Sequence, residues 1–494
     1  MKLKYIITAL TSLGVCFSSC SDFLNQVPLS NLSEGDYYKA AEDFTAAVNG
    51  AYSTLQEGAL LNDRYVFAEI PSDNTHEQSS GTVSAQDGFD EFYLTSENGN
   101  LSNIWNTAYR GINRANTVLG RIDKVEMDAT LTARYKLEMK FIRAYLYFDL
   151  VRVFGDVPLV LKEVSISESL NVVRDSKEDV YAQIIADLKE VIADIPESYD
   201  AANSGRATKG SARALLGDIY MTTHKYSEAE TILGEIVNSG KYALLENTAG
   251  SLNRDGYEKV FDPNNHNSSE AVFEIQFKKG GYGEGFGLVN TYAPGNSGTN
   301  VVTVGGTGDN NLPDLDIWEA FEENDLRREW SMALGYYDSR YDNRWTEATH
   351  IRKYRDTPHA GGDSNNNYPV YRYADVLLMY SEALNENGKL SDAIRYLNMT
   401  RRRGFGYQST ETTPVDLAPT SQAEFRLAVE QERRVELAFE NKRWFDLIRT
   451  GRAVEVMKSK GHKLNETNLI CPIPQAQIDL NDKLTENTYN IEPR

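Results

Sequence analysis

The residue whose chemistry the sequence indicates most directly is Cys20. Lys2 and Lys4 precede an apolar stretch from Tyr5 to Val15, which is shorter than the roughly 20 residues of a membrane-spanning helix and typical of a secretory signal. The segment ends against a cysteine rather than at a small-x-small cleavage site. We therefore predict a signal peptide over residues 1–19 and a diacylglycerol group on the Cys20 thiol. The alternative is an ordinary leader in which this cysteine is incidental.

Motifs for the common catalytic chemistries are missing from the sequence. It contains no His-Glu-x-x-His zinc motif, no Gly-x-Ser-x-Gly elbow and no phosphate-binding loop. With 72 acidic residues, a pair of carboxylates suited to glycoside hydrolysis is guaranteed by number alone and carries no information. We therefore predict no catalytic residues, and an enzyme such as a lipid-anchored glycosidase is the minority hypothesis.

Metal and cofactor sites have equally little support. The histidines are scattered along the chain, so they form no local ligand set. The Asp/Asn cluster from Asp309 to Asp316 has the right oxygen ligands for calcium, but it lacks the glycine and the terminal glutamate of an EF-hand loop. A solvated turn is the favoured interpretation, and we predict no metal and no cofactor.

Composition excludes several further classes of protein. The formal net charge is −21 and no long basic run interrupts it, which argues against nucleic acid as a partner. After the leader only Cys20 and Cys471 remain, so a disulfide framework is excluded, and Cys471 is expected to be a small buried residue. A hydrophobic content of 41% is ample for a large core.

Two amphipathic segments show the helical period clearly. One runs from Leu137 to Val151 and is stopped by Gly155 and Pro158. The other runs from Val180 to Ile195, with Ser176 as its N-cap. Each has one apolar face, so each needs a partner helix.

A repeat supplies such partners. Residues 211–236 and 374–403 carry small and apolar side chains at the spacing of tetratricopeptide helix pairs, and Gly217 with Ala229 lets the first pair approach closely. Such repeats stack on one another, because a single pair cannot bury its own faces. We predict a mainly α fold, a superhelical stack of tetratricopeptide-like helix pairs with long irregular loops and a few short strands. The alternative is a set of unrelated helical hairpins.

Two regions break the helical pattern. Residues 73–102 and about 245–368 are rich in Gly, Asn, Asp, Ser and aromatic residues, with short strand-like runs such as Ala271 to Phe277. Long loops on a rigid scaffold are usually functional, so this architecture is typical of a binding protein. No linker divides the chain. We therefore predict an acylated tether over residues 20–40 and a single domain over residues 41–494.

Several long stretches of the chain resemble the RagB/SusD family of Bacteroidetes outer-membrane lipoproteins. They occur in the order of the family and cover nearly the whole chain: CSDFLNQVP at 20–28, IWNTAYRGINRAN at 104–116, FIRAYLYFDLVRVFGDVPLV at 141–160, YRYADVLLMYSEALNE at 371–386, ERRVELAFENKRWFDLIRTG at 432–451 and CPIPQAQIDLN at 471–481.

The resemblance implies a location and two partners. It implies a lipid-anchored protein on the outer face of the outer membrane, which captures a nutrient and passes it to a SusC-like TonB-dependent transporter. Most characterised members of the family bind glycans and some handle peptides, so a glycan is the expected ligand and a peptide the alternative. A third class is a scaffold that binds only the transporter.

A glycan site needs exposed aromatic platforms beside polar groups, because a sugar has flat apolar faces and a rim of hydroxyls. The two loop regions contain both kinds of side chain. The candidate ligand contacts are Asp73, Asn74, Tyr93, Tyr292, Trp318, Tyr337, Arg340, Tyr341, Arg344 and Trp345. For each of them the alternative is a residue that only fixes its own loop, so the prediction applies to the regions more than to single residues.

The family motifs themselves are predicted to be structural. In the segment Glu432–Gly451, two apolar helical faces are separated by a break near Asn441, and charges of both signs alternate between them. Such charges can form ion pairs that fix the packing of one helix on another. Trp105 and Tyr109, one helical turn apart, have the same interpretation.

Overall fold

The computed structural model describes residues 37–78 and 84–490. The predicted signal peptide, Cys20 and most of the predicted tether therefore lie outside the described residues. Within the described ranges no helix is both long enough and apolar enough to cross a membrane.

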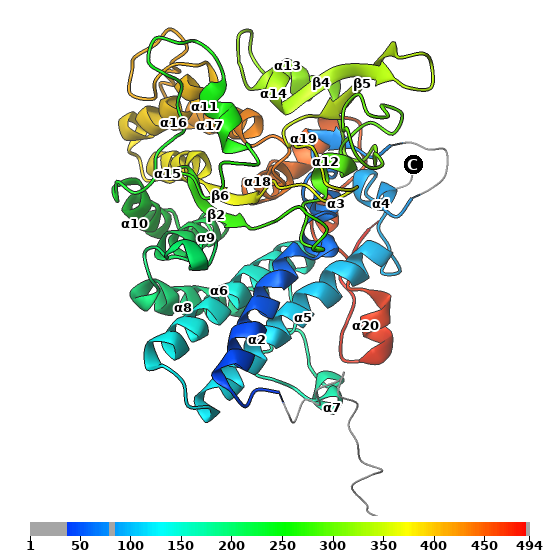
Figure 1. Ribbon diagram of the computed structural model, residues 1–494, viewed down its shortest axis with the longest axis vertical. Helices are drawn as coiled ribbons and strands as arrows, with labels where there is room; N and C mark the ends of the chain where they lie inside the picture. Colours follow the sequence, from blue (N-terminus) through cyan, green and yellow to red (C-terminus); the bar gives the residue numbers. More distant parts are fainter. Residues whose placement is uncertain (1–36, 79–83, 491–494) are drawn as a thin grey trace, which may run out of the picture.

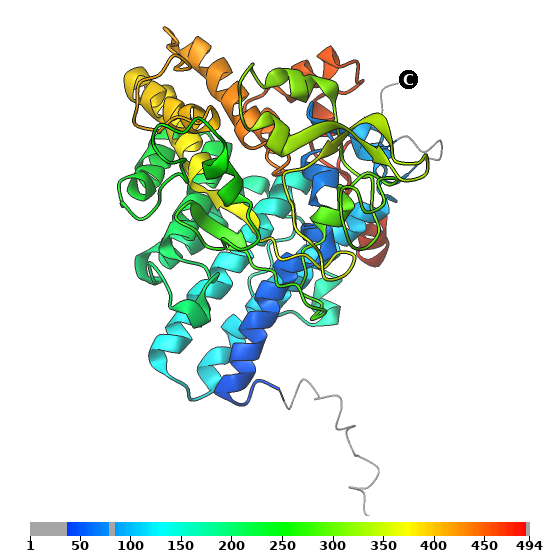
Figure 2. The same cartoon turned by 45° about the horizontal axis from the view of Figure 1, so that its top comes forward.

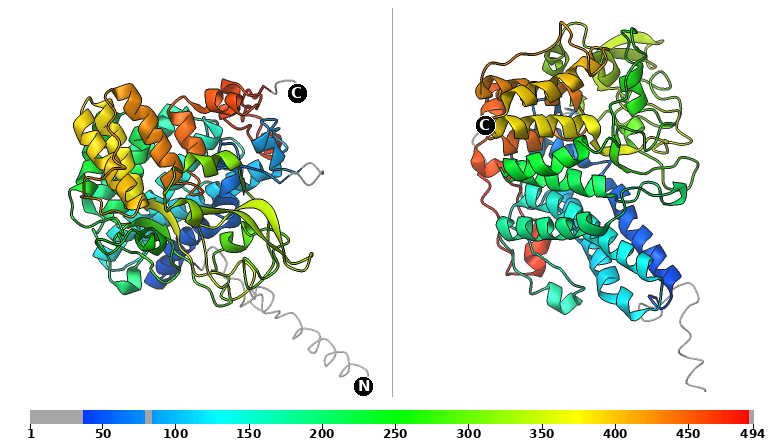
Figure 3. Two further views of the ribbon diagram at one scale, coloured as in Figure 1. Left: turned by 90° about the horizontal axis from the view of Figure 1, so that it is seen from above. Right: turned by 90° about the vertical axis from the view of Figure 1, so that its left-hand side faces the viewer.

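The fold is mainly helical, as predicted, and its helices lie in successive layers (Figure 3, right). The lower layers in Figure 1 contain four long helices: α2 (Ala41–Ser53), α5 (Gly99–Arg121), α6 (Ala129–Phe154) and α8 (Lys177–Asp194). The sequence located two of these helices well. Gly155 ends α6 with a φ of 69°, which favours glycine, and the Ser176 side chain accepts a hydrogen bond from the Asp179 amide at the start of α8.

The predicted repeats form helix pairs that stack on one another. The first pair is α9 (Lys209–Thr222) with α10 (Tyr226–Val237), and the second is α15 (Tyr373–Glu386) with α16 (Leu390–Gly404). Helix α8 packs on α9, α10 packs on α15, and α17 (Gln422–Glu436) packs on α15 and α16. The close approach expected at Gly217 is confirmed, because a Cβ atom there would lie 2.7 Å from Cγ of Leu233. The tetratricopeptide-like superhelix thus extends from α6 to α17.

The prediction of an irregular loop is wrong for one part of the 245–368 region. Residues 336–345, expected to be an irregular loop, belong to a β-hairpin in which β4 (Met332–Asp338) pairs with β5 (Arg344–Ile351) (Figure 2). Tyr337 lies opposite Trp345, and the positive φ angles of Asp342 and Asn343 form the turn. The burial pattern along Met332–Asp338 does not alternate strictly, because the pairing is irregular between Ala333 and Gly335, so the period of two that marks a strand is hidden in the sequence. The strand expected from Ala271 is confirmed as β2 (Ala271–Ile275), which pairs with β6 (Tyr368–Arg372).

Short elements fill the remaining chain, including the 73–102 region. The third strand pair is β1 (Thr75–His76) with β3 (Leu312–Pro313). The short α-helices are α3 (Arg64–Ala68), α4 (Asp87–Asp90), α7 (Ile166–Ser169), α11 (Asp255–Val260), α12 (Leu288–Thr291), α13 (Leu315–Ala320), α14 (Arg328–Ser331), α18 (Arg443–Arg449), α19 (Ala453–Ser459) and α20 (Gln475–Leu480). The main apolar core runs from Phe44 in α2 to Ile473 near the C-terminus, so it joins the helical layers to the strands.

Candidate functional site

Exposed aromatic side chains gather on the β4–β5 hairpin. Tyr337, Tyr341 and Trp345 expose 54%, 55% and 50% of their surface. Tyr337 and Trp345 form a cross-strand pair, with ring centroids 5.2 Å apart and planes inclined by 74°. The hairpin therefore holds two aromatic faces in a fixed position in solvent.

A cavity of about 340 Å³ lies against this aromatic pair. Its wall combines rings and apolar groups with polar ones, the mixture that binds a ligand with apolar faces and a polar rim. The lining residues used below are Asn300, Tyr336, Tyr337, Trp345, His350, Arg352, Tyr354, Arg355 and Asp356. We call this space the hairpin cavity.

Some polar groups of the hairpin cavity are already hydrogen-bonded within the protein, and others have no partner among the described residues. The Asn300 amide donates to the Tyr337 carbonyl over 2.8 Å, which ties a neighbouring loop to the hairpin. His350 is 3% exposed, and no described residue offers its Nδ1 a hydrogen bond. Burial lowers the pKa of His350 to about 4, so the imidazole is neutral at pH 7 and can donate or accept a single hydrogen bond.

The structure brings five of the predicted ligand contacts together. Tyr337, Arg340, Tyr341, Arg344 and Trp345 all lie on the hairpin or its turn. The guanidinium groups of Arg340 and Arg344 lie 5.3 Å and 5.4 Å from the centroid of the Tyr341 ring. Arg340 also pairs with Asp338 over 2.8 Å, so Arg344 keeps more freedom to reach a ligand.

Three other predicted contacts lie inside the protein. The Asp73 carboxylate accepts from Arg443 over 2.7 Å, and Asn74 donates to Glu69 over 3.0 Å. Tyr292 is buried with its ring centroid 6.3 Å from that of Tyr354, beneath the hairpin cavity. These side chains hold the fold together in this conformation.

Tyr93 and Trp318 are half-buried and lie outside the lining of the hairpin cavity. The guanidinium group of Arg328 lies 4.7 Å from the centroid of the Trp318 ring, which occupies one aromatic face with a protein group. As ligand contacts, both residues stay predictions.

The sequence reasoning missed the cationic side of the cavity. Arg352 and Arg355 follow directly on β5 and line the same space as Trp345. A signal was present, because Trp345 and the stretch His350–Arg355 stand close together in a region already chosen for its aromatic residues. The expectation of an irregular loop hid the fact that one hairpin positions them all.

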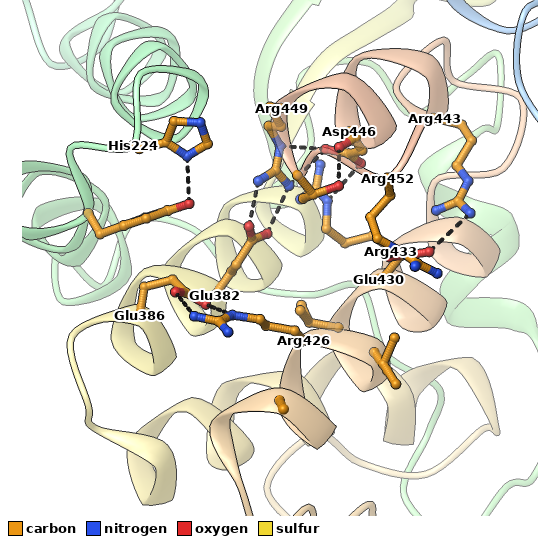
Figure 4. A pocket seen from close by; sticks show the side chains of 15 residues that line it. His224, Glu382, Glu386, Arg426, Glu430, Arg433, Arg443, Asp446, Arg449 and Arg452 are labelled. Atoms are coloured by element: carbon orange, nitrogen blue, oxygen red, sulfur yellow. Dashed lines mark hydrogen bonds and ion pairs between the residues drawn. The ribbon is translucent and has the colours of Figure 1, made fainter. Parts of the chain in front are cut away.

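A larger cavity, of about 500 Å³, lies between α10, α15, α17 and α18 (Figure 4). Its charged side chains neutralise one another: Arg449 reaches both Glu382 and Asp446, and Arg426 pairs with Glu386. Part of its wall comes from the motif segment Glu432–Gly451, whose charged side chains form ion pairs as predicted. We assign this cavity to the packing of the superhelix, because its charges are already satisfied by the protein.

The described residues show neither a clustered set of metal ligands nor an activated thiol. No group of three or more His, Cys, Asp or Glu side chains there is arranged to bind a metal ion. In the Asp309–Asp316 cluster, Asp314 pairs with His76 over 2.5 Å and Asp316 pairs with Arg434 over 3.4 Å. Burial raises the pKa of the Cys471 thiol to about 12, which makes it a poor nucleophile.

Comparison with known families gives matches over most of the chain. Residues 302–489 match the model of the SusD family, and residues 22–221 match a SusD-like model described as starch-binding and associating with the outer membrane. SusD-like protein P2 of Formosa agariphila is 27% identical over 98% of both chains. A SusD-like protein of Bacteroides ovatus is 26% identical over 91% of this chain and 82% of its own.

Solved structures give the same result. A laminarin-binding SusD-like protein has a TM-score of 0.76 and 26% identity, over 91% of this chain and 99% of its own. Surface glycan-binding protein A of Bacteroides thetaiotaomicron, solved with laminarihexaose, has a TM-score of 0.76 at 23% identity, over 91% of this chain and 100% of its own, and so supports the fold. Sequence and fold together show that the chain belongs to the SusD-like family of carbohydrate-binding, outer-membrane-associated proteins.

Proposed function

We propose that the protein is a lipid-anchored, cell-surface lipoprotein that captures oligo- or polysaccharide and passes it unaltered to a SusC-like TonB-dependent transporter. The observation that carries the proposal is the pair Tyr337 and Trp345, both half in solvent, beside the hairpin cavity. Aromatic residues exposed on a rigid strand pair offer the flat apolar surface that a sugar ring covers.

Family membership supports the remaining parts of this proposal. The apolar leader ending at Cys20 supports the lipid anchor, and the transporter follows from the family resemblance. A modest affinity for one sugar unit is compatible with the role, because several sites along one polymer act together through effective concentration.

The acidic side chain that lines the hairpin cavity is already held by other protein groups, which favours binding over cleavage. Near the hairpin cavity, the Asp356 carboxylate accepts from the Lys279 ammonium over 2.8 Å and from the amides of Thr357 and Asn365 over 2.7 Å each. These three interactions commit the carboxylate to the protein, so it is not free to act on a bound sugar. His350 also lines the hairpin cavity, and burial lowers its pKa to about 4, so the imidazole is neutral at pH 7.

Affinity electrophoresis with product analysis tests the proposal. Residues 21–494 contain every described residue, and they are run in gels that contain polysaccharides of different classes. We expect retardation by one class without cleavage, and loss of that retardation in the variant Y337A/W345A. Cleavage products would indicate a glycosidase. No retardation by any polysaccharide would remove the glycan from the proposal, and a parallel screen of peptides would then test the alternative ligand.

A matched control separates loss of the site from loss of the fold. Tyr282 is 67% exposed and lies outside the lining of the hairpin cavity. The variant Y282A therefore removes an equally exposed aromatic residue and should keep the retardation. Retardation lost equally in Y282A and in Y337A/W345A would contradict the assignment of the hairpin as the site.

A further inference from the structure

Arginine side chains inside this acidic protein are almost always matched by carboxylates. Arg327, Arg372 and Arg403, all at most 3% exposed, each make ion pairs with two or more carboxylates. Arg352 and Arg355 in the hairpin cavity differ from them. Neither guanidinium has a carboxylate within ion-pair distance among the described residues, although both are only half-exposed. The cavity therefore carries positive charge that the protein leaves unneutralised.

Backbone groups hold these two side chains in place without neutralising them. Nε of Arg355 donates to the Arg352 carbonyl over 2.8 Å, and Nη2 donates to the Trp330 carbonyl over 3.0 Å. The guanidinium group stacks 3.6 Å from the centroid of the Trp330 ring. Nη1 of Arg355 has no acceptor in the described part of the chain. The guanidinium group of Arg355 is thus held in one orientation, and its Nη1 remains free to donate a hydrogen bond to a ligand.

The arrangement has an electrostatic cost for the protein without a ligand. Burial, followed by the charges of Arg352 and Arg254, lowers the pKa of Arg355 to about 9, so the cation persists at pH 7 in a site that disfavours it. The carboxylate of Asp356 lines the same cavity, but it is already committed to Lys279. Glu258 and Glu329 offset this repulsion only through space and form no ion pair with either arginine, so a bound anion would relieve it further.

The turn end of the hairpin carries a further cation, outside the lining of the cavity. Arg344 stands next to Trp345 on β5, and it too makes no ion pair with any described residue. Its guanidinium group lies over the exposed Tyr341 ring. Guanidinium groups without an ion-pair partner among the described residues thus lie at both ends of β5, Arg344 beside the turn and Arg352 beyond the open end.

We propose that the hairpin cavity binds an anionic glycan, one that carries carboxylate or sulfate groups, with Arg352 and Arg355 as anion partners and Tyr337 and Trp345 as stacking platforms. The inference rests on the proposed glycan-binding function and specifies its substrate class. Guanidinium groups bind carboxylate and sulfate oxygens through paired, charge-assisted hydrogen bonds. The hydroxyls of a neutral polysaccharide can accept hydrogen bonds from the two guanidinium groups, but they leave the positive charge unneutralised.

The test compares three polymers by the affinity of residues 21–494. Polygalacturonate supplies carboxylates, a sulfated galactan supplies sulfate esters, and laminarin is neutral. We expect binding to one of the anionic polymers, weakened by added salt because exposed charges are screened. The double variant R352Q/R355Q should lose about tenfold or more of that affinity. The variant R355K keeps the positive charge but not the planar guanidinium group, so it should keep part of the affinity.

Two controls distinguish a lost contact from a lost fold. Arg395 is exposed on α16, away from the hairpin in Figure 1, and makes no ion pair with a described residue, so R395Q removes the same charge elsewhere and should bind like wild type. Thermal unfolding of each variant shows whether the loss of Arg355 damages the site by destabilising the chain.

Each outcome decides the inference. Preference for an anionic polymer that is lost in R352Q/R355Q and kept in R395Q supports it, and which polymer binds identifies carboxylate or sulfate as the anion. Equal or stronger binding of laminarin, unchanged in R352Q/R355Q, overturns the anionic class while the glycan-binding function stands. Binding of no polysaccharide at all overturns both.

Discussion

The network around Glu436 and the hairpin cavity are both rich in arginine. In the network the arginine charges form ion pairs with carboxylates, and in the cavity they form none with the described residues. One Glu436 oxygen accepts from Arg372 and Arg403 over 2.5 Å each, and the other accepts from Arg327 over 2.8 Å. Although burial opposes ionisation, these three cations hold the pKa of Glu436 far below its usual range. In the hairpin cavity, Arg355 has only backbone carbonyls and a tryptophan ring as partners.

This difference separates the residues that build the fold from those available to a ligand. The network joins α17 to β6, α16 and the loop before α14, so its charges have no capacity left for another molecule. The cavity keeps donors, a buried imidazole and aromatic faces that the protein does not use. The motifs that make the chain recognisable are therefore the wrong place to look for its ligand.

The largest effect on stability is expected from Glu436→Gln. Three buried cations would lose their shared carboxylate, and breaking a buried ion pair from one side costs about 3–5 kcal/mol. Urea denaturation of the variant should show a clearly lower midpoint. Glu411→Gln is the control, because Glu411 is exposed in a loop. An unchanged midpoint for Glu436→Gln would remove the contrast between the two regions.

A smaller effect, with opposite signs at two positions, is expected from matched Gly→Ala changes. Gly217 packs on the buried side chain of Leu233, so an added Cβ should overpack the helix pair and destabilise the protein by about 1–3 kcal/mol. Gly120 in α5 has nothing within 4 Å of that position, so alanine there should stabilise the helix by about 0.5–1 kcal/mol. Denaturation curves of both variants measure the two changes in the free energy of unfolding. Changes of the same sign would contradict the packing described for α9 and α10.

The hairpin aromatics should contribute little to the stability of the protein. Trp345 is half exposed, so Trp345→Ala is expected to change the free energy of unfolding by about 0.5 kcal/mol or less while weakening glycan binding. Urea denaturation beside affinity electrophoresis measures both quantities on one sample. A variant that unfolds much more easily than wild type would place Trp345 with the scaffold instead of the site.

A pH-dependent effect concerns Glu69, a carboxylate near the network that has no ion-pair partner among the described residues. It accepts hydrogen bonds from the Asn74 amide and the Phe439 backbone, and burial raises its pKa to about 7. The unfolded chain has a glutamate pKa of about 4.3, so between these values the folded state binds more protons than the unfolded state. The contribution of Glu69 to stability should therefore increase as the pH falls from 8 to 5.5.

Glu69→Gln isolates this contribution, because glutamine does not titrate. The difference in unfolding free energy between wild type and Glu69→Gln should shift in favour of wild type at the lower pH. Comparing the two proteins cancels the opposite effect of His350, whose lowered pKa makes folding less favourable in acid. A difference that does not vary with pH would show that Glu69 is ionised and paired in solution.

Sequence reasoning succeeded where a local pattern decides the structure. The small residue Gly217, the cap Ser176 and the break near Asn441, whose φ is 59°, each follow from a few neighbouring residues. The ion pairs of the motif Glu432–Gly451 were also foreseen, because alternating charges on a buried helix need partners.

It failed where the deciding contact is distant. Asp73 was taken for a ligand contact because it stands in a polar loop, but Arg443, 370 positions later, holds it inside the protein. The same limit concealed Arg352 and Arg355. Their importance lies in the absence of a carboxylate partner, and no sequence pattern reveals which charges of an acidic chain remain unmatched.

The central claim, that the hairpin is the glycan-binding surface of this protein, is tested most directly by isothermal titration calorimetry of residues 21–494 with oligosaccharides from the polymer that retards it. We predict measurable binding by wild type and by Y282A, no measurable binding by Y337A/W345A, and the same thermal unfolding for all three. Equal affinity of Y337A/W345A and wild type would contradict the claim.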